Sequence, residues 1–202
     1  MKRRLILGTW NPALITVLVG CWLTDLPGAV AAPETYVIDP EHTFPSFEAD
    51  HWGTSIWRGK FDSSAGVVSL DHAAQTGSVR ITVKLASVDF GHKALNRWAR
   101  GPELFDTAKF SVAVYEGRLT GFQNGAPTRV DGELTLHGVT RPLALKINSF
   151  TCRPHPFLSR PMCGADAFGT FRRDEFGLDA EKNHGFDMNV TLRIQVEAVK
   201  PK

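Results

Sequence analysis

The chain has 202 residues, of which 43% are hydrophobic and 22% are charged. This is the composition of a globular protein, and it excludes a disordered tail or a collagen-like fibre. Basic residues number 23 and acidic residues 21, and removal of the first 32 residues leaves 20 of each. A neutral chain has no electrostatic drive toward DNA or anionic lipid surfaces, so we expect no nucleic-acid partner.

Residues 1–32 have the order of a secretory signal peptide. Three basic residues follow the initiating methionine, residues 5–23 are mostly apolar, and small residues then lead up to Pro33. A membrane-anchoring helix is the alternative, because the apolar stretch is nearly long enough to span a bilayer. The small-residue ending favours cleavage by a signal peptidase. We therefore expect export to the periplasm and one domain over residues 33–202.

Residues 18–21, Leu-Val-Gly-Cys, offer a second form of export. They resemble a lipobox, in which Cys21 would be acylated and become the mature N-terminus. Trp22 and Leu23 extend the apolar stretch beyond this cysteine, and an acceptable cleavage site lies downstream. We therefore favour a soluble exported protein, whose membrane contact would be transient unless Cys21 is acylated.

Two cysteines, Cys152 and Cys163, remain beyond residue 32. A pair of cysteines in an exported domain most often forms a disulfide. A metal site built from both cysteines and His155 is the alternative, but Pro154 and Pro156 flank the histidine and no fourth ligand stands at zinc-finger spacing. We therefore expect a disulfide and no metal ion.

Most of residues 33–202 alternate between apolar and polar side chains, which is the period of a half-buried strand. The alternation is clearest in residues 78–85 and returns in residues 190–197. Turn residues, such as those at 62–66 and 123–125, separate the segments. The sequence predicts eight antiparallel strands. They are centred on residues 47–51, 57–61, 78–85, 110–114, 130–136, 143–147, 167–171 and 190–197.

Residues 91–106 are the one helical interval. Ala94, Leu95, Trp98 and Ala99 share one face of an amphipathic turn, and Gly101 followed by proline stops it. The sequence therefore predicts one short helix in an all-β domain.

Eight antiparallel strands either close into a barrel or stack as a sandwich. Charged side chains such as Arg80, Glu133 and Arg193 occupy the polar face near the middle of the strands, where a membrane-spanning barrel needs apolar residues. The predicted outside is therefore wet and the inside apolar. The interior of an eight-stranded barrel is either packed or holds one small ligand.

Catalytic motifs are absent from the sequence. It contains no nucleophile elbow, no His-Glu-x-x-His, no Cys-x-x-Cys and no dinucleotide-binding glycine pattern. His51 shares the inward side of its strand with Phe47 and Ala49, and its imidazole serves either a ligand or the fold; we favour the fold. We nominate no catalytic residue.

Several motifs resemble the YceI-like family. Residues 36–43, Tyr-Val-Ile-Asp-Pro-Glu-His-Thr, open the match, and Gly-Val-Thr-Arg-Pro at 138–142 and Arg-Asp-Glu-Phe-Gly at 173–177 are its most specific elements. Shorter matches lie between them at 59–61 and 87–89. The match runs in order along nearly all of residues 33–202.

The resemblance implies a lipocalin-like antiparallel barrel with a short helix, whose interior holds an isoprenoid lipid of the polyprenyl or quinone type. It implies no enzymatic activity and no required cofactor. It leaves open whether the protein forms a homodimer. The family's ligand contacts are mostly apolar side chains of the barrel wall, so strand parity nominates the candidates. They are Phe47, His51, Trp57, Phe61, Val79, Ile81, Val83, Phe105, Phe110 and Val112.

Two segments depart from the family's pattern. Residues 149–166 carry the cysteines in place of a plain hairpin, and residues 95–100 lack the acidic residue usual in the helix. We expect both segments to border the pocket mouth. Candidates to hold a phosphate or quinone oxygen there are Arg58, Arg97, Arg100 and His51.

Two other functions remain open at this stage. One is a thiol-redox or quinone-linked oxidoreductase that uses Cys152 and Cys163, which would need an exposed thiolate of low pKa. The other is a packed barrel that acts as an interaction module, because aromatic residues at alternating spacing most often form a core.

Overall fold

The computed structural model describes residues 32–202. The expected signal peptide, apart from Ala32, lies outside the described residues, as do the alternative anchor and Cys21. The described residues form one compact unit. Among the described residues, no helix has the length and apolar character to cross a membrane.

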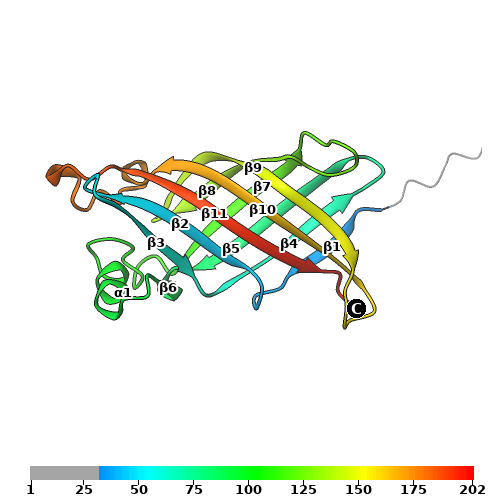
Figure 1. Ribbon diagram of the computed structural model, residues 1–202, viewed down its shortest axis with the longest axis horizontal. Coiled ribbons are helices and arrows are strands. Elements are labelled where there is room, and N and C mark those ends of the chain that lie inside the picture. Colours follow the sequence, from blue (N-terminus) through cyan, green and yellow to red (C-terminus); the bar gives the residue numbers. More distant parts are fainter. Residues whose placement is uncertain (1–31) are drawn as a thin grey trace, which may run out of the picture. The chain divides into compact units, whose positions relative to one another are not determined.

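The described residues form an antiparallel sheet that closes on itself (Figure 1). The strands are β1 (Glu34–Ile38), β2 (Phe44–His51), β3 (Ser55–Phe61), β4 (Ser64–Asp71), β5 (Thr76–Lys84), β6 (Val88–Asp89), β7 (Val112–Thr120), β8 (Arg129–Leu136), β9 (Val139–Pro154), β10 (Pro161–Arg172) and β11 (Asn189–Val199). Their order is β1-β4-β5-β7-β8-β9-β10-β11-β2-β3-β6, and β11 also pairs with β1. The sheet is therefore a closed barrel.

The barrel has eight strands because two of them are interrupted. β1 and β2 are two halves of one strand, broken at residues 39–43, and β3 and β4 are broken at Asp62 and Ser63. The short β6 adds only to the end of β3. Each of the eight predicted segments falls on a different strand of this barrel, which confirms the expected fold.

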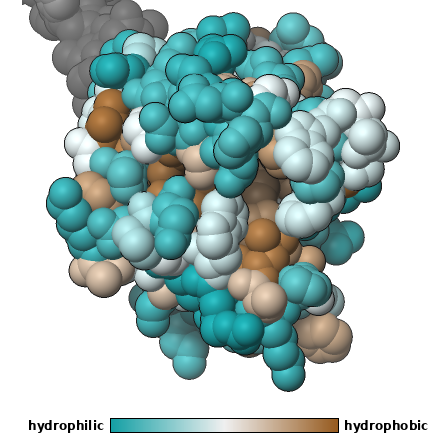
Figure 2. Space-filling view, turned by 90° about the vertical axis from the view of Figure 1, so that its left-hand side faces the viewer, coloured by the Kyte–Doolittle hydropathy of each residue, from teal (hydrophilic) through white to brown (hydrophobic). Residues whose placement is uncertain are grey.

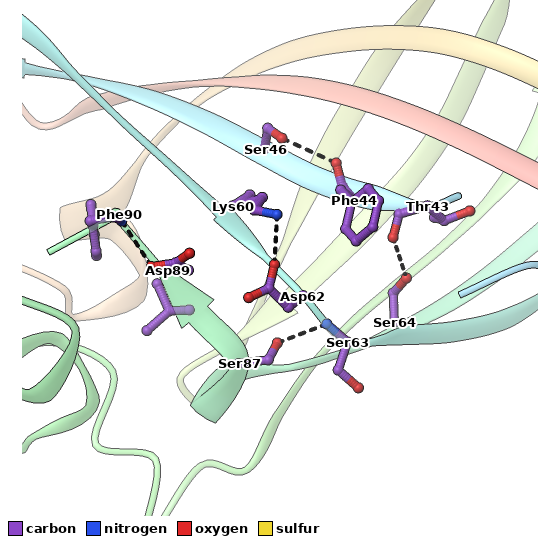
Figure 3. A network of polar contacts seen from close by, with 12 residues as sticks. Thr43, Phe44, Ser46, Lys60, Asp62, Ser63, Ser64, Ser87, Asp89 and Phe90 are labelled. Carbon is purple, nitrogen blue, oxygen red and sulfur yellow. Dashed lines mark hydrogen bonds and ion pairs between the residues drawn. The ribbon is translucent and has the colours of Figure 1, made fainter. Parts of the chain in front are cut away.

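The turn predicted at residues 62–66 is wrong. Only Asp62 and Ser63 leave the pairing, and the chain bends there without reversing. The amide of Asp62 donates to the Ser87 carbonyl (3.1 Å), and the Ser63 carbonyl accepts from the Lys84 amide (3.0 Å). These bonds guide the chain from β3 into β4. Figure 3 shows a further hydrogen bond beside the bend, in which the Ser63 amide donates to the Ser87 hydroxyl (3.0 Å).

Thr43 closes the barrel at the break between β1 and β2. Its side chain is 2% exposed, and its hydroxyl donates to the Glu197 carbonyl and accepts from the Glu197 amide, both at 3.1 Å. The carbonyl of Thr43 accepts from the Ser64 hydroxyl (3.2 Å), a bond drawn in Figure 3. The side chain of Thr43 therefore replaces the missing strand pairing with β11, and its backbone carbonyl binds the start of β4.

The predicted helix is confirmed as α1 (Lys93–Arg100), which lies at one end of the barrel (Figure 1). The ring of His92 caps it by accepting from the Leu95 amide (3.1 Å). Asn96 fastens it to β6 by donating to Asp89 and accepting from the Phe90 amide, both at 2.8 Å. Three short 3-10 helices complete the elements: η1 (Leu85–Ser87), η2 (Arg173–Phe176) and η3 (Lys182–His184).

Cys152 and Cys163 form the expected disulfide, with an S–S distance of 2.04 Å. They lie directly opposite each other on β9 and β10, so the bond joins the base of the hairpin that carries His155. The alternative of a metal site is wrong, because both thiols are consumed by the disulfide. The described residues contain no cluster of metal-binding side chains.

We predict that Thr43→Val lowers the free energy of unfolding by about 1–3 kcal/mol, because it leaves the half-buried amide of Glu197 without its hydroxyl acceptor. Urea unfolding followed by tryptophan fluorescence measures this change. The matched control is Thr170→Val, whose exposed hydroxyl meets only the Thr191 hydroxyl (3.4 Å). Equal effects of the two substitutions would contradict the role of Thr43 in closing the barrel.

Candidate functional site

A cavity of about 480 Å³ lies inside the barrel. This volume is within the range of about 300–1,000 Å³ found for small-molecule sites. Inward side chains from all eight strands line it, and most of them are aliphatic or aromatic. The alternative of a packed barrel is therefore wrong, because side chains do not fill the interior.

The cavity is closed at one end and open at the other. At the closed end its lining residues Tyr36, Leu70 and Leu119 are buried. At the other end the lining includes the exposed side chains of Trp57 and Trp98. Figure 2 looks at this open end, where hydrophobic side chains are visible between the hydrophilic groups of the rim.

Eight of the ten nominated residues line the cavity: Phe47, His51, Trp57, Phe61, Val79, Ile81, Val83 and Phe105. On β2 and β3 a close contact between Phe47 and Gly59 fixes which side chains point into the cavity. The ring of Phe47 lies over Gly59, where an added Cβ would come within 2.5 Å of it. Phe47 also packs on Phe61, with ring centroids 5.6 Å apart. Gly59 therefore makes room for the aromatic residue of the neighbouring strand.

Phe110 and Val112 do not line the cavity, and this part of the expectation is wrong. On β7 the inward residues are Ala113, Tyr115 and Leu119, so Val112 points outward and is 41% exposed. Phe110 lies before the strand and packs on the ring of His137, with centroids 4.2 Å apart. Alternation does not distinguish the two faces here, because the first residues of β7 are apolar on both the inward and the outward face.

The arginines expected at the mouth also lie elsewhere. Arg58 donates to Glu48 on the outer face of β2 (3.0 Å), and Arg100 donates to the Val88 carbonyl (3.1 Å). Arg97 is exposed on α1, and none of the three lines the cavity. Apart from Tyr36 and Tyr115, the titratable groups that do line it are Asp50, His51, Arg173, Glu181 and Asp187.

The segment that carries three of these groups connects β10 to β11 and is fastened by Arg173. Its half-buried guanidinium donates to the carbonyls of Leu178 and Ala180, both at 2.7 Å. Burial lowers the pKa of Arg173 from its usual value. Gly177 ends η2 in the left-handed region, with φ of 75°, which lets the chain turn toward the mouth.

Asp174 joins the two 3-10 helices of this segment. Its carboxylate accepts from Lys182 of η3 and from Arg172, both at 2.8 Å. The hydrogen bonds from Lys182 and Arg172 lower the pKa of Asp174 from 3.8 to about 2. These contacts hold the polar side of the mouth in one arrangement.

Aromatic side chains form the other side of the mouth. His51 is stacked on Trp57, with centroids 4.3 Å apart and ring planes 5° apart. Phe186 packs against His51 and against Trp52 at 5.4 and 4.9 Å. No ring hydrogen bond is recorded for His51 among the described residues, and its role in this structure is to stack at the mouth.

Sequence reasoning missed two groups of lining residues. The inward residues of β8, β9 and β11, such as Leu134, Leu145 and Ile194, lie in alternations that the sequence displays, but they were not nominated. The residues of the β10–β11 segment carry no periodicity, so no local signal identifies Glu181 or Phe186. The expectation that residues 149–166 border the mouth is wrong, because the β9–β10 hairpin lies at the opposite end (Figure 1).

An antiparallel eight-stranded barrel with an apolar cavity open at one end is the architecture of a lipocalin-like binding protein. The family model described as the YceI-like domain matches residues 36–198. The chain therefore belongs to the YceI-like family, as its motifs predicted.

The relatives agree with this assignment. The chain is 31% identical over 190 residues to a UPF0312 protein of Shewanella sp. (strain W3-18-1), covering 93% of this chain and 97% of that protein. Two solved structures share the fold. Burkholderia cenocepacia BcnA matches with a TM-score of 0.60 at 18% identity, over 77% of this chain and 96% of that one. A polyisoprenoid binding domain from Saccharophagus degradans, implicated in plant cell wall breakdown, matches with a TM-score of 0.58 at 20% identity, over 82% and 98%.

Acid should loosen the mouth segment through Asp174. Its pKa is lower in the folded protein than in the unfolded chain, so its contribution to stability is present above about pH 4 and is lost as the pH falls toward 2. We predict that Asp174→Asn makes the unfolding free energy depend less on pH between 4 and 2. Urea unfolding at a series of pH values measures the slope.

The control for this prediction is Asp62→Asn, which removes an exposed ion pair with Lys60 (2.9 Å) that includes no residue of η2. An equal flattening of the pH dependence in both variants would contradict the assignment to Asp174.

Proposed function

We propose that this protein is exported and buries one isoprenoid lipid, of the polyprenyl or quinone type, inside its barrel. The observation that carries the proposal is the cavity of about 480 Å³, walled almost wholly by aliphatic and aromatic side chains. A ligand that fits such walls is a long hydrocarbon, because each buried polar group would lack a partner. The charged side chains of the lining, such as Asp50 and Asp187, lie near the mouth, where a head group would lie.

The energetics favour a chain-like guest. Removal of apolar ligand surface from water contributes about 25 cal/mol per Å², so each 100 Å² of buried hydrocarbon contributes about 2.5 kcal/mol. The closed barrel supplies its walls in advance, which limits the ordering cost of binding.

Two independent observations support the ligand class and the compartment. The Saccharophagus degradans domain that shares this fold is described as polyisoprenoid binding. The signal-like residues 1–32 and the disulfide fit a protein delivered to the periplasm. There the protein would carry or store its lipid.

We predict that protein purified from a bacterial periplasm without detergent contains close to one isoprenoid molecule per chain. Mass spectrometry of an organic extract identifies and counts it.

Ala167 lines the cavity from β10, and we predict that Ala167→Trp fills space that at least two methylene groups of the lipid would occupy. At about 0.8 kcal/mol per methylene, the affinity should fall at least about tenfold.

The matched control is Ala144→Trp, because Ala144 is exposed on the outer face of β9. Retention of lipid by Ala167→Trp, or an equal loss from both variants, would count against the cavity as the binding site. A wild-type chain that takes up no isoprenoid when the lipid is supplied in excess would overturn the proposed function.

The disulfide should stabilise the barrel without contributing to lipid binding. We predict that the double variant Cys152→Ala, Cys163→Ala, which keeps the cavity wall apolar where Cys163 lines it, loses roughly 3 kcal/mol of unfolding free energy, as expected for a closed loop of this length. Its lipid content should equal that of the wild-type chain at 25 °C, measured by mass spectrometry of the folded fraction. A folded variant with native lipid content but no function in cells would favour the thiol-redox alternative.

A further inference from the structure

We propose that the mouth of the cavity is a membrane-docking surface. Its exposed apolar side chains would enter the interfacial layer of a phospholipid bilayer and open the cavity directly onto the lipids. This inference rests on the proposed function, because an isoprenoid lipid resides in a membrane before it is bound. The side chains of this mouth rim are the exposed Trp52, Ile56, Trp57 and Trp98 and the half-buried Phe186.

Tryptophan is concentrated at the mouth. The described residues contain three tryptophans, Trp52, Trp57 and Trp98, which come from the β2–β3 hairpin and from α1. Their exposed fractions are 55%, 40% and 37%, and Ile56 beside them is 47% exposed. Tryptophan prefers the membrane–water interface, because its large apolar ring and its N–H group suit the two sides of that boundary.

The rim is held in place before it meets a membrane. The indole of Trp52 donates to the His184 carbonyl (3.0 Å), and its ring packs on Phe186. Trp57 is stacked on His51. The β2–β3 hairpin and the segment before β11 therefore support each other. Because these rings are already fixed, docking would cost little additional side-chain entropy.

The rim is continuous with the cavity. Trp57, Trp98 and Phe186 line the cavity and also belong to the rim. A hydrocarbon chain that leaves the bilayer at this point would pass from lipid tails to aromatic walls without crossing water. This continuity favours a bilayer as the occupant of the rim over a folded protein partner, which would cover the opening.

The charges at the mouth are of both signs. The cavity lining there contributes Asp50, Glu181, Asp187 and Arg173, and Arg97 lies on the exposed side of α1. Such a mixture does not attract the protein to anionic lipids over zwitterionic ones. Docking should therefore depend on burial of the rim side chains and persist at high salt.

A second exposed aromatic side chain, at the opposite end of the barrel, provides a control. Phe157, at the tip of the β9–β10 hairpin, is 90% exposed and lies close in sequence to Arg153 and Arg160. This hairpin is far from the mouth along the barrel (Figure 1). An aromatic residue among basic residues would bind anionic membranes and release them in salt, which separates the two surfaces experimentally.

The experiment uses exported protein whose intact mass shows a processed N-terminus without an acyl chain, so that tryptophan remains only in the rim. Phosphatidylcholine vesicles with brominated acyl chains should quench its fluorescence, equally at 0.1 and 1 M salt. The double variant Trp52→Ser, Ile56→Ser should partition into vesicles at least tenfold more weakly. Phe157→Ser should bind as the wild type does.

Three results would overturn the proposal. They are the absence of quenching, binding that requires anionic lipid and is lost in salt, and a loss of binding in Phe157→Ser alone. Lipid content, measured separately by mass spectrometry, distinguishes this inference from the proposed function. A chain that holds isoprenoid but ignores vesicles refutes only the docking surface, whereas one that docks but never takes up isoprenoid refutes only the proposed function.

Discussion

The buried hydroxyl of Thr43 bridges the gap in the backbone pairing of β11 with β1 and β2, the pairing that closes this sheet. A strand that coils around a small barrel at a tilt has to bend, and at the break between β1 and β2 the ladder with β11 is interrupted. Thr43 binds both the amide and the carbonyl of Glu197, so the interruption leaves these half-buried backbone groups satisfied. The same residue binds Ser64 at the neighbouring break, which couples the two bends.

The interior stays hollow because small and large inward residues are unevenly distributed. β10 and β7 contribute small residues such as Ala165, Ala167 and Ala113, whereas the opposing walls contribute leucine, valine and phenylalanine. A closed sheet cannot collapse to fill the space, because its radius is set by strand number and stagger. The cavity is therefore a consequence of the barrel's geometry together with a few alanines.

The two ends of the barrel serve different purposes. At the closed end, strand pairing and the Cys152–Cys163 disulfide hold the hairpins together. At the open end, α1 and the β10–β11 segment surround the mouth, where Arg173 and Asp174 fix polar loops and the tryptophans remain exposed. The disulfide therefore lies away from the mouth, and the exposed tryptophans lie where, under the proposed function, a lipid would enter.

Alternation along the chain determined the eight strands, the single helix and most of the wall, since a period of two allows only one face of each strand to be buried, as at Val79 and Ile81. It failed at Val112, where both faces begin apolar, and at residues 62–66, where backbone bonds to Ser87 and Lys84 turn an expected reversal into a bend. Only the tertiary structure placed Arg173, Glu181 and Phe186 at the mouth and the cysteine hairpin at the far end. Loop positions depend on contacts between segments distant in sequence, and no local pattern records them.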